Sequence, residues 1–97
     1  NLLNSGSNFF QLVSLIGSQF ELMLEIMELD HEGLSLAAIV KEVGMHEFRV
    51  KKAYRASQKF TLKRMKQILA SLYEIDKNVK SGNIDQRTAL ELFVAKI

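Results

Sequence analysis

The positive charges of this sequence are concentrated in one stretch, and that clustering indicates an acidic partner. Residues 48–73 contain eight Lys or Arg and no Asp or Glu, whereas residues 1–47 contain seven acids and one base. The net charge is only +2, so the distribution of charge says more about a partner than the total does. We expect contacts with nucleic-acid phosphates or an acidic protein surface at five positions. These are Arg49, Lys51, Lys52, Arg55 and Lys59.

The basic stretch also has the pattern of a helix-turn-helix. Residues 36–43 form a short expected helix, Gly44 a turn, and residues 47–57 a second helix with a basic outer face. In DNA-binding domains of this kind the second helix enters the major groove. The outer face of this helix lacks the mixture of Asn, Gln, Ser and Thr that is common at base-reading positions. A solvated basic face, an acidic-partner surface and a stand-alone DNA-binding domain therefore stay open. The expected inward positions are Val50, Ala53, Tyr54 and Ser57.

No group of residues has the spacing of a metal site or a catalytic centre. Residues 30–32 (Asp-His-Glu) are adjacent, and adjacent helical residues point in different directions. The glutamates at 21, 25 and 28 suit a solvated helix face. The chain has no cysteine, no G-x-S-x-G turn and no P-loop. We expect no catalytic residue, no metal and no cofactor, and a small helical enzyme would need a polar pocket that the sequence does not suggest.

The elements that must position these residues are helices. Of the 97 residues, 47% are hydrophobic and 25% charged, which is typical of one globular domain. Proline, which disrupts helix interiors, is absent, and apolar residues recur at three- and four-residue spacings. We predict an all-α, compact bundle of about five helices. The first and fourth helices should be long and the other three shorter.

Start and stop signals set the expected helix boundaries. The first helix should run from residue 8 to about residue 32 and end at Gly33, and a turn should follow at residues 81–83. Four polar residues precede the later helices and can accept a hydrogen bond from their first turn. Apolar pairs around the first three of these form expected hydrophobic staples. The caps are Ser35, His46, Thr61 and Asp85, and the pairs are Leu34 with Ile39, Met45 with Val50, and Phe60 with Met65.

The first and last helices carry more large apolar residues than one narrow face needs. Such an excess is explained either by a thick core of five helices or by an interface with another chain. On the last helix, Val94 falls on the apolar stripe, and Phe48 and Val50 are assigned to the core. The candidate interface residues are Phe10, Leu15, Leu22, Leu90, Phe93 and Ile97.

Several segments, in order along the chain, resemble the C-terminal domain of the bacterial DNA polymerase III delta subunit. The most specific is residues 46–51, His-x-Phe-Arg-Val-Lys, where the family usually has proline after the histidine and this chain has Glu47. Either residue suits a first helical position. The other similar segments are residues 17–24, 32–35, 39–45, 57–61, 76–82 and 89–93.

The resemblance implies a non-catalytic role in a clamp loader. Residues 1–7 would be the junction from a preceding domain, and residues 8–97 the helical oligomerisation domain. This domain would join the tau/gamma and delta-prime subunits in a collar, while the sliding clamp would be bound only by N-terminal domains outside this chain. The resemblance further implies a cytoplasmic protein without ATPase activity. From the residues themselves we expect no membrane contact, because charged residues interrupt the long apolar stretches, and we expect that any DNA binding by the basic patch is weak.

Overall fold

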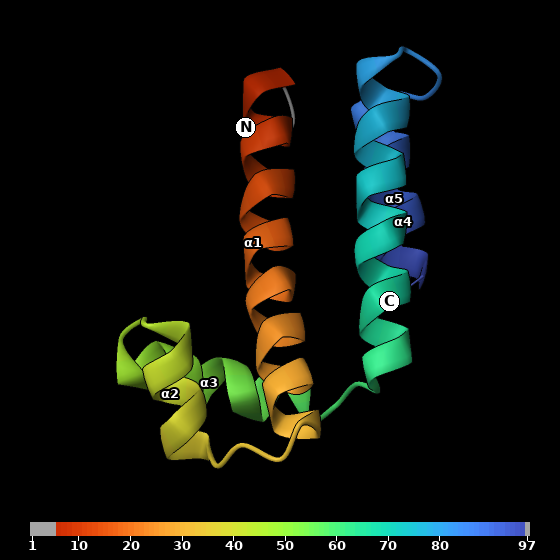
Figure 1. Ribbon diagram of the computed structural model, residues 1–97. Coiled ribbons are helices and arrows are strands. Elements are labelled where there is room, and N and C mark those ends of the chain that lie inside the picture. Colours follow the sequence, from red (N-terminus) through yellow and green to blue (C-terminus); the bar gives the residue numbers. More distant parts are fainter. Residues whose placement is uncertain (1–5, 97) are drawn as a thin grey trace. The chain divides into compact units, whose positions relative to one another are not determined.

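The computed structural model describes the backbone of residues 6–96 and the side chains of residues 9–95, and these residues form five helices and no strand (Figure 1). The prediction of an all-α fold with long first and fourth helices is confirmed. The first helix starts two residues earlier than predicted, and residues 1–5 of the expected junction lie outside the described residues. The helices are α1 (Gly6–His31), α2 (Leu36–Val43), α3 (Glu47–Ser57), α4 (Leu62–Lys80) and α5 (Gln86–Lys96).

All four predicted N-caps are confirmed by hydrogen bonds. In each case a side-chain atom accepts from a backbone N–H in the first turn, which satisfies one of the donors that a helix start leaves without a partner. Ser35 Oγ accepts from Ala38 at 3.2 Å, His46 Nδ1 from Phe48 at 3.1 Å, Thr61 Oγ1 from Arg64 at 3.0 Å and Asp85 Oδ1 from Thr88 at 2.8 Å.

Glycines in the left-handed conformation follow α1, α2 and α4. After α1, Gly33 has φ 97° and its N–H donates to the Asp30 carbonyl, while the Leu34 N–H donates to the Leu29 carbonyl. This pair of bonds is the Schellman motif, in which glycine avoids the steric cost that a Cβ carries at positive φ. The two other glycines, Gly44 and Gly82, have φ 74° and 80°. The predicted stop at Gly33 and the predicted turn around Gly82 are thereby confirmed.

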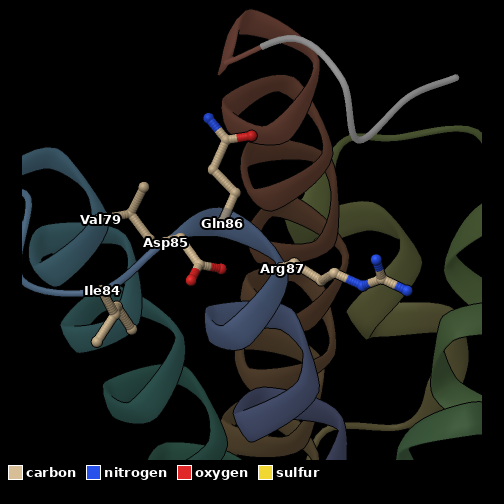
Figure 2. Close-up of a pocket in the computed structure, with 5 residues that line it drawn as sticks. All are labelled: Val79, Ile84, Asp85, Gln86 and Arg87. Atoms are coloured by element: carbon tan, nitrogen blue, oxygen red, sulfur yellow. The ribbon is translucent and has the colours of Figure 1, made fainter.

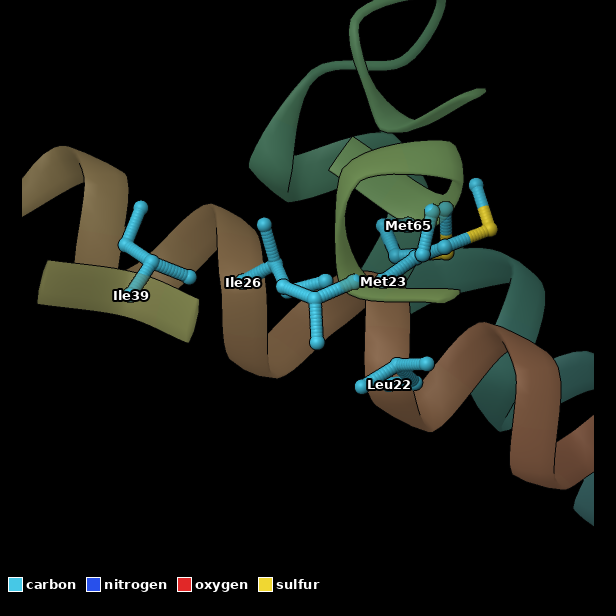
Figure 3. Packing of buried hydrophobic residues seen from close by; sticks show 7 residues of the cluster. Leu22, Met23, Ile26, Ile39 and Met65 are labelled. Carbon is cyan, nitrogen blue, oxygen red and sulfur yellow. The ribbon is translucent and has the colours of Figure 1, made fainter. Parts of the chain in front are cut away.

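Contacts divide the chain into two compact units, and α1 and α4 each contribute to both. The middle unit comprises residues 19–66, and the terminal unit comprises residues up to 18 together with residues from 67 onward. Within the middle unit, α2 packs against α3. A buried apolar cluster forms its core, with side chains from α1, α2, α3 and α4 converging (Figure 3). The cluster is Leu22, Met23, Ile26, Ile39, Val50, Ala53 and Met65.

The terminal unit has buried apolar residues of its own on α1, α4 and α5. At one point, the Phe9 and Phe10 rings meet edge to face with centroids 5.1 Å apart. The Lys80 ammonium lies 5.5 Å from the Phe10 ring centroid and 2.8 Å from the Asp76 carboxylate, so the exposed side of Phe10 is partly covered by a cation. The buried residues are Phe9, Val13, Ile68, Leu69, Leu72, Ile75, Ala89 and Phe93.

Replacing Gly17 with alanine should stabilise the chain by about 0.5–1 kcal/mol, because glycine is a poor residue in a helix interior. A Cβ at Gly17 would lie 3.5 Å from Leu72 Cδ2 and 4.0 Å from Tyr73 Cε1, which are ordinary van der Waals distances. Urea unfolding of the variant measures the change in the free energy of unfolding. Gly44→Ala is the matched control and should destabilise the chain by about 1 kcal/mol, since its φ is 74°. A destabilised Gly17→Ala variant would contradict the packing described.

Candidate interaction surfaces

The basic helix α3 has one buried face and one charged face. Val50, Ala53 and Ser57 are buried and Tyr54 is half-buried, which confirms the predicted inward stripe. Ser57, a polar residue in this buried row, donates its hydroxyl to the Tyr54 carbonyl at 2.6 Å, so its burial leaves no polar group without a partner. The remaining positions of α3 are therefore those available to a partner.

The basic side chains around α3 differ in whether an acid neutralises them. The Lys51 ammonium lies 3.2 Å from the Glu47 carboxylate one turn earlier. Within the part of the chain that the structure describes, the other four predicted contact residues form no ion pair, and all four are exposed. Their charges are thus directed at solvent or at a partner. They are Arg49, Lys52, Arg55 and Lys59.

Two apolar residues near the start of α3 are exposed rather than buried. Phe48 is 65% exposed, so its assignment to the core is wrong. Val50 takes the inward position and is fully buried, and two residues of helix turn the chain by about 200°, which points Phe48 away from the core. Met45 is 44% exposed, so the expected staple with Val50 does not bury it. An aromatic ring therefore stands in the basic surface.

Beside α3, a cavity of about 340 Å³ separates this helix from α1 within the middle unit. Its buried lining is apolar, and its exposed lining carries two cations and one amide. No acidic residue lines it. We refer to this feature as the α1–α3 cavity; its lining residues are Gln19, Met23, Arg49, Lys52, Ala53 and Ala56.

The terminal unit exposes several large apolar side chains. Leu15 is 60% exposed and Val94 is 68% exposed, so Val94 does not belong to the buried stripe of α5 as predicted. Leu92 and Tyr73 are also exposed. Isolated exposed apolar residues are common on protein surfaces. Here the four residues lie on α1, α4 and α5 of one unit. They are therefore the candidate residues for an apolar interface.

The other candidate interface residues are less accessible. Leu22 and Phe93 do not supply exposed apolar surface as expected, because they are only 4% and 3% exposed. Leu22 belongs to the core cluster of the middle unit, and Phe93 lies one turn after the buried Ala89 on the inward face of α5. Phe10 and Leu90 are half-buried, and Ile97 lies outside the described residues.

A second cavity, of about 470 Å³, surrounds the start of α5 (Figure 2). Its lining includes Val79, Ile84 and the N-cap Asp85. The backbone N–H of Thr88 donates to Asp85, and the Thr88 hydroxyl donates to the second carboxylate oxygen at 3.0 Å. These bonds, the backbone bond first, hold the pKa of Asp85 below its ordinary value of 3.8. The carboxylate is thus occupied with capping the helix.

This cap gives an expected pH dependence. A carboxyl group whose pKa is lower in the folded state stabilises the fold above its unfolded pKa, and this contribution is lost as pH falls through the folded pKa. Asp85→Ala should therefore lower Tm by a few degrees at neutral pH, with a difference from wild type that shrinks below the ordinary pKa of 3.8. Thermal unfolding followed by circular dichroism at neutral and acidic pH measures it. Asp85→Asn retains a capping oxygen, so a deficit as large as that of Asp85→Ala would contradict the capping role.

The residues considered for metal binding do not converge. Across the described residues, no three His, Asp or Glu side chains are grouped so that they could hold an ion. His46 uses its Nδ1 to cap α3, and His31 and Asp30 line a separate cavity of about 180 Å³. Nor, over the same residues, is any helix both long and apolar enough to cross a membrane.

The described residues define an all-α class of domain with a basic helix and exposed apolar residues, and sequence comparison assigns the family. The family described as DNA polymerase III delta subunit, C-terminal domain, matches residues 1–97. The chain belongs to this family.

Two comparisons with proteins of Bacillus subtilis agree with that membership. DNA polymerase III subunit delta of Bacillus subtilis (strain 168) is 28% identical over 97 residues, which are 100% of this chain and 28% of the relative. The solved structure of the Bacillus subtilis DNA clamp loader delta protein (YqeN) is similar with a TM-score of 0.81 and 28% identity. That similarity covers 91% of this chain and 26% of the solved one, so the chain spans little more than a quarter of either relative.

Proposed function

We propose that this chain is a non-catalytic domain that holds a delta subunit in the clamp loader of a bacterial DNA polymerase III. The observation that carries the proposal is the family match over residues 1–97, together with the similarity in fold to a DNA clamp loader delta protein. The relatives are far longer than this chain. In keeping with the family resemblance, the proposal assigns opening of the sliding clamp to regions that lie outside residues 1–97. On this proposal the protein is cytoplasmic, as replication takes place there in bacteria.

The role proposed for the domain is oligomerisation. Residues 8–97 would pack beside the C-terminal domains of the tau/gamma and delta-prime subunits in a collar. Because the neighbours differ from one another, each domain has two different contact surfaces, a heterologous arrangement. Burial of apolar surface drives such packing. The exposed Leu15, Leu92 and Val94 of the terminal unit support this role, with Phe10 and Leu90 as half-buried contributors.

Duplex DNA binding by α3 is the second candidate function. It is favoured by Arg49, Lys52 and Arg55, which are exposed, form no ion pair among the described residues and lie on a helix packed against α2 as in a helix-turn-helix. Lys59, in the turn after α3, is likewise exposed and without an ion pair among these residues. Phosphate contacts alone would give binding without sequence preference and with a steep salt dependence. The absence of Asn, Gln, Ser and Thr from the early outer positions of α3 argues against base recognition.

The collar role is tested by the native mass of a mixture. This chain would be combined at micromolar concentration and moderate salt with the C-terminal domains of the tau/gamma and delta-prime subunits from the same bacterium. A stable heteromeric complex is the expected result. A chain that keeps its monomer mass in the mixture, yet binds duplex DNA with a sequence preference, would overturn the collar role in favour of the DNA-binding one.

A further inference from the structure

The α1–α3 cavity joins an apolar floor to a positively charged rim. Met23 and Ala53 are 7% and 8% exposed and form the floor with the half-buried Ala56. Arg49 and Lys52 are exposed and line the same cavity. Since neither cation forms an ion pair among the described residues and no acid lines the cavity, its charge is uncompensated.

The neighbouring surface of α3 adds an exposed aromatic ring. Phe48 is 65% exposed and lies four residues before Lys52, so the two side chains are neighbours on the helix surface. Aromatic and Arg side chains are enriched where proteins bind other proteins, and Lys is depleted there. The combination of Phe48, Arg49 and an adjoining apolar hollow therefore suits a polypeptide partner.

We propose that the α1–α3 cavity binds an acidic segment of another protein. An apolar side chain of the segment would pack on Met23, Ala53 and Ala56, and its carboxylates would contact Arg49 and Lys52. A helix or peptide laid along a groove between two helices is a common mode of recognition, with apolar anchors spaced by three or four residues. The site belongs to the middle unit, whereas the apolar residues proposed for the collar belong to the terminal unit, so neither proposal depends on the other.

The aliphatic lining of this cavity favours a polypeptide over nucleic acid. Single-stranded nucleic acid is held by aromatic platforms on which bases stack and by cations that follow the backbone. The floor here is Met and Ala, and no aromatic residue lines the cavity. An aliphatic side chain fits such a floor, and a carboxylate within about one helical turn of it meets the cations.

A fluorescein-labelled acidic peptide of about 14 residues, or four helical turns, is the probe. It carries leucine at positions spaced by three and four residues and glutamate elsewhere. Fluorescence anisotropy with the 97-residue chain gives its Kd. Two peptide controls separate the two contacts: one has serine for each leucine, and the other has glutamine for each glutamate. Both should bind at least about tenfold more weakly, because each removes one of the two interactions.

The protein variants locate the site. The double variant Arg49→Glu with Lys52→Glu should bind the probe at least about tenfold more weakly, since it removes two attractions and adds two repulsions. Lys63→Glu with Lys66→Glu makes the same change in net charge at exposed positions of α4 that do not line the cavity, and should stay within about twofold of wild type. Gln19→Glu is a single substitution that tests the same site with little change in side-chain size. It places a carboxylate in the cavity lining and should therefore weaken binding of the acidic peptide.

Three results would overturn the proposal. Equal losses in both double variants would show that the whole basic surface attracts acids without a site. Tighter binding of a labelled oligothymidine than of the peptide, lost in the Arg49/Lys52 variant, would assign the surface to nucleic acid. If the peptide did not bind at a protein concentration of about 1 mM, the cavity would not be a binding site for acidic segments. Circular dichroism of each variant establishes that it is folded before its Kd is used.

Discussion

Replacing Ile26 with alanine should lower the free energy of unfolding by about 2–5 kcal/mol, the range observed when a fully buried aliphatic side chain is truncated. Ile26 is 0% exposed and lies in the core cluster of the middle unit, beside Met23 on α1 and with Ile39 of α2 in the same cluster. Truncation removes apolar contacts and leaves a cavity that helices anchored on several sides fill only in part. In a domain of this size, such a loss should lower Tm by about 10 °C or more.

Leu15→Ala is the matched control for this prediction. It truncates an aliphatic residue to alanine on the same helix, but Leu15 is 60% exposed, so the free energy of unfolding should change by no more than about 0.5 kcal/mol. Urea unfolding of both variants provides the comparison, with the slope against urea checked for two-state behaviour. Similar losses in the two variants would show that Ile26 does not lie in a tightly packed core.

Helix boundaries were the most predictable part of this fold, because they depend on local chemistry. Ser35 and Thr61 each accept a hydrogen bond from the residue three positions later, and that relation is visible in the sequence alone. The end of α1 at Gly33 was predictable for a similar reason, because the Schellman motif needs a residue with positive φ and glycine adopts it most readily. Periodicity identified the inward row of α3, since Val50, Ala53 and Ser57 follow one helical face.

The surfaces were less predictable, because they depend on which neighbour covers an apolar residue. Phe48 and Val50 are both apolar and close in sequence, but the helix turns one outward and the other inward. On α5, Val94 follows the buried Phe93 directly and is itself 68% exposed. The α1–α3 cavity combines residues about thirty positions apart, such as Gln19 and Arg49, and no spacing rule connects them. The sequence did indicate its cations, through the run of bases without acids.

Val94→Lys should abolish the proposed heteromeric complex while leaving the domain folded. Val94 is 68% exposed, so the free energy of unfolding should change by no more than about 1 kcal/mol. Lysine is also a favourable residue in the last turn of a helix, where it meets the negative end of the helix dipole. If Val94 is buried against a neighbouring collar domain, the same lysine would have to lose its hydration there, a cost of several kcal/mol without an acidic partner.

Ala95→Lys separates apolar burial from charge. It adds the same charge to the next residue of α5, which is also exposed but has almost no apolar side chain to bury. The native mass of each variant, mixed with the tau/gamma and delta-prime C-terminal domains, should show a complex with Ala95→Lys and none with Val94→Lys. A complex that forms equally well with both would remove the end of α5 from the interface, and the half-buried Phe10 and exposed Leu15 of α1 would then be the residues to replace. Loss with both would instead indicate that the neighbour repels positive charge along this helix, since burial of Val94 alone predicts different outcomes.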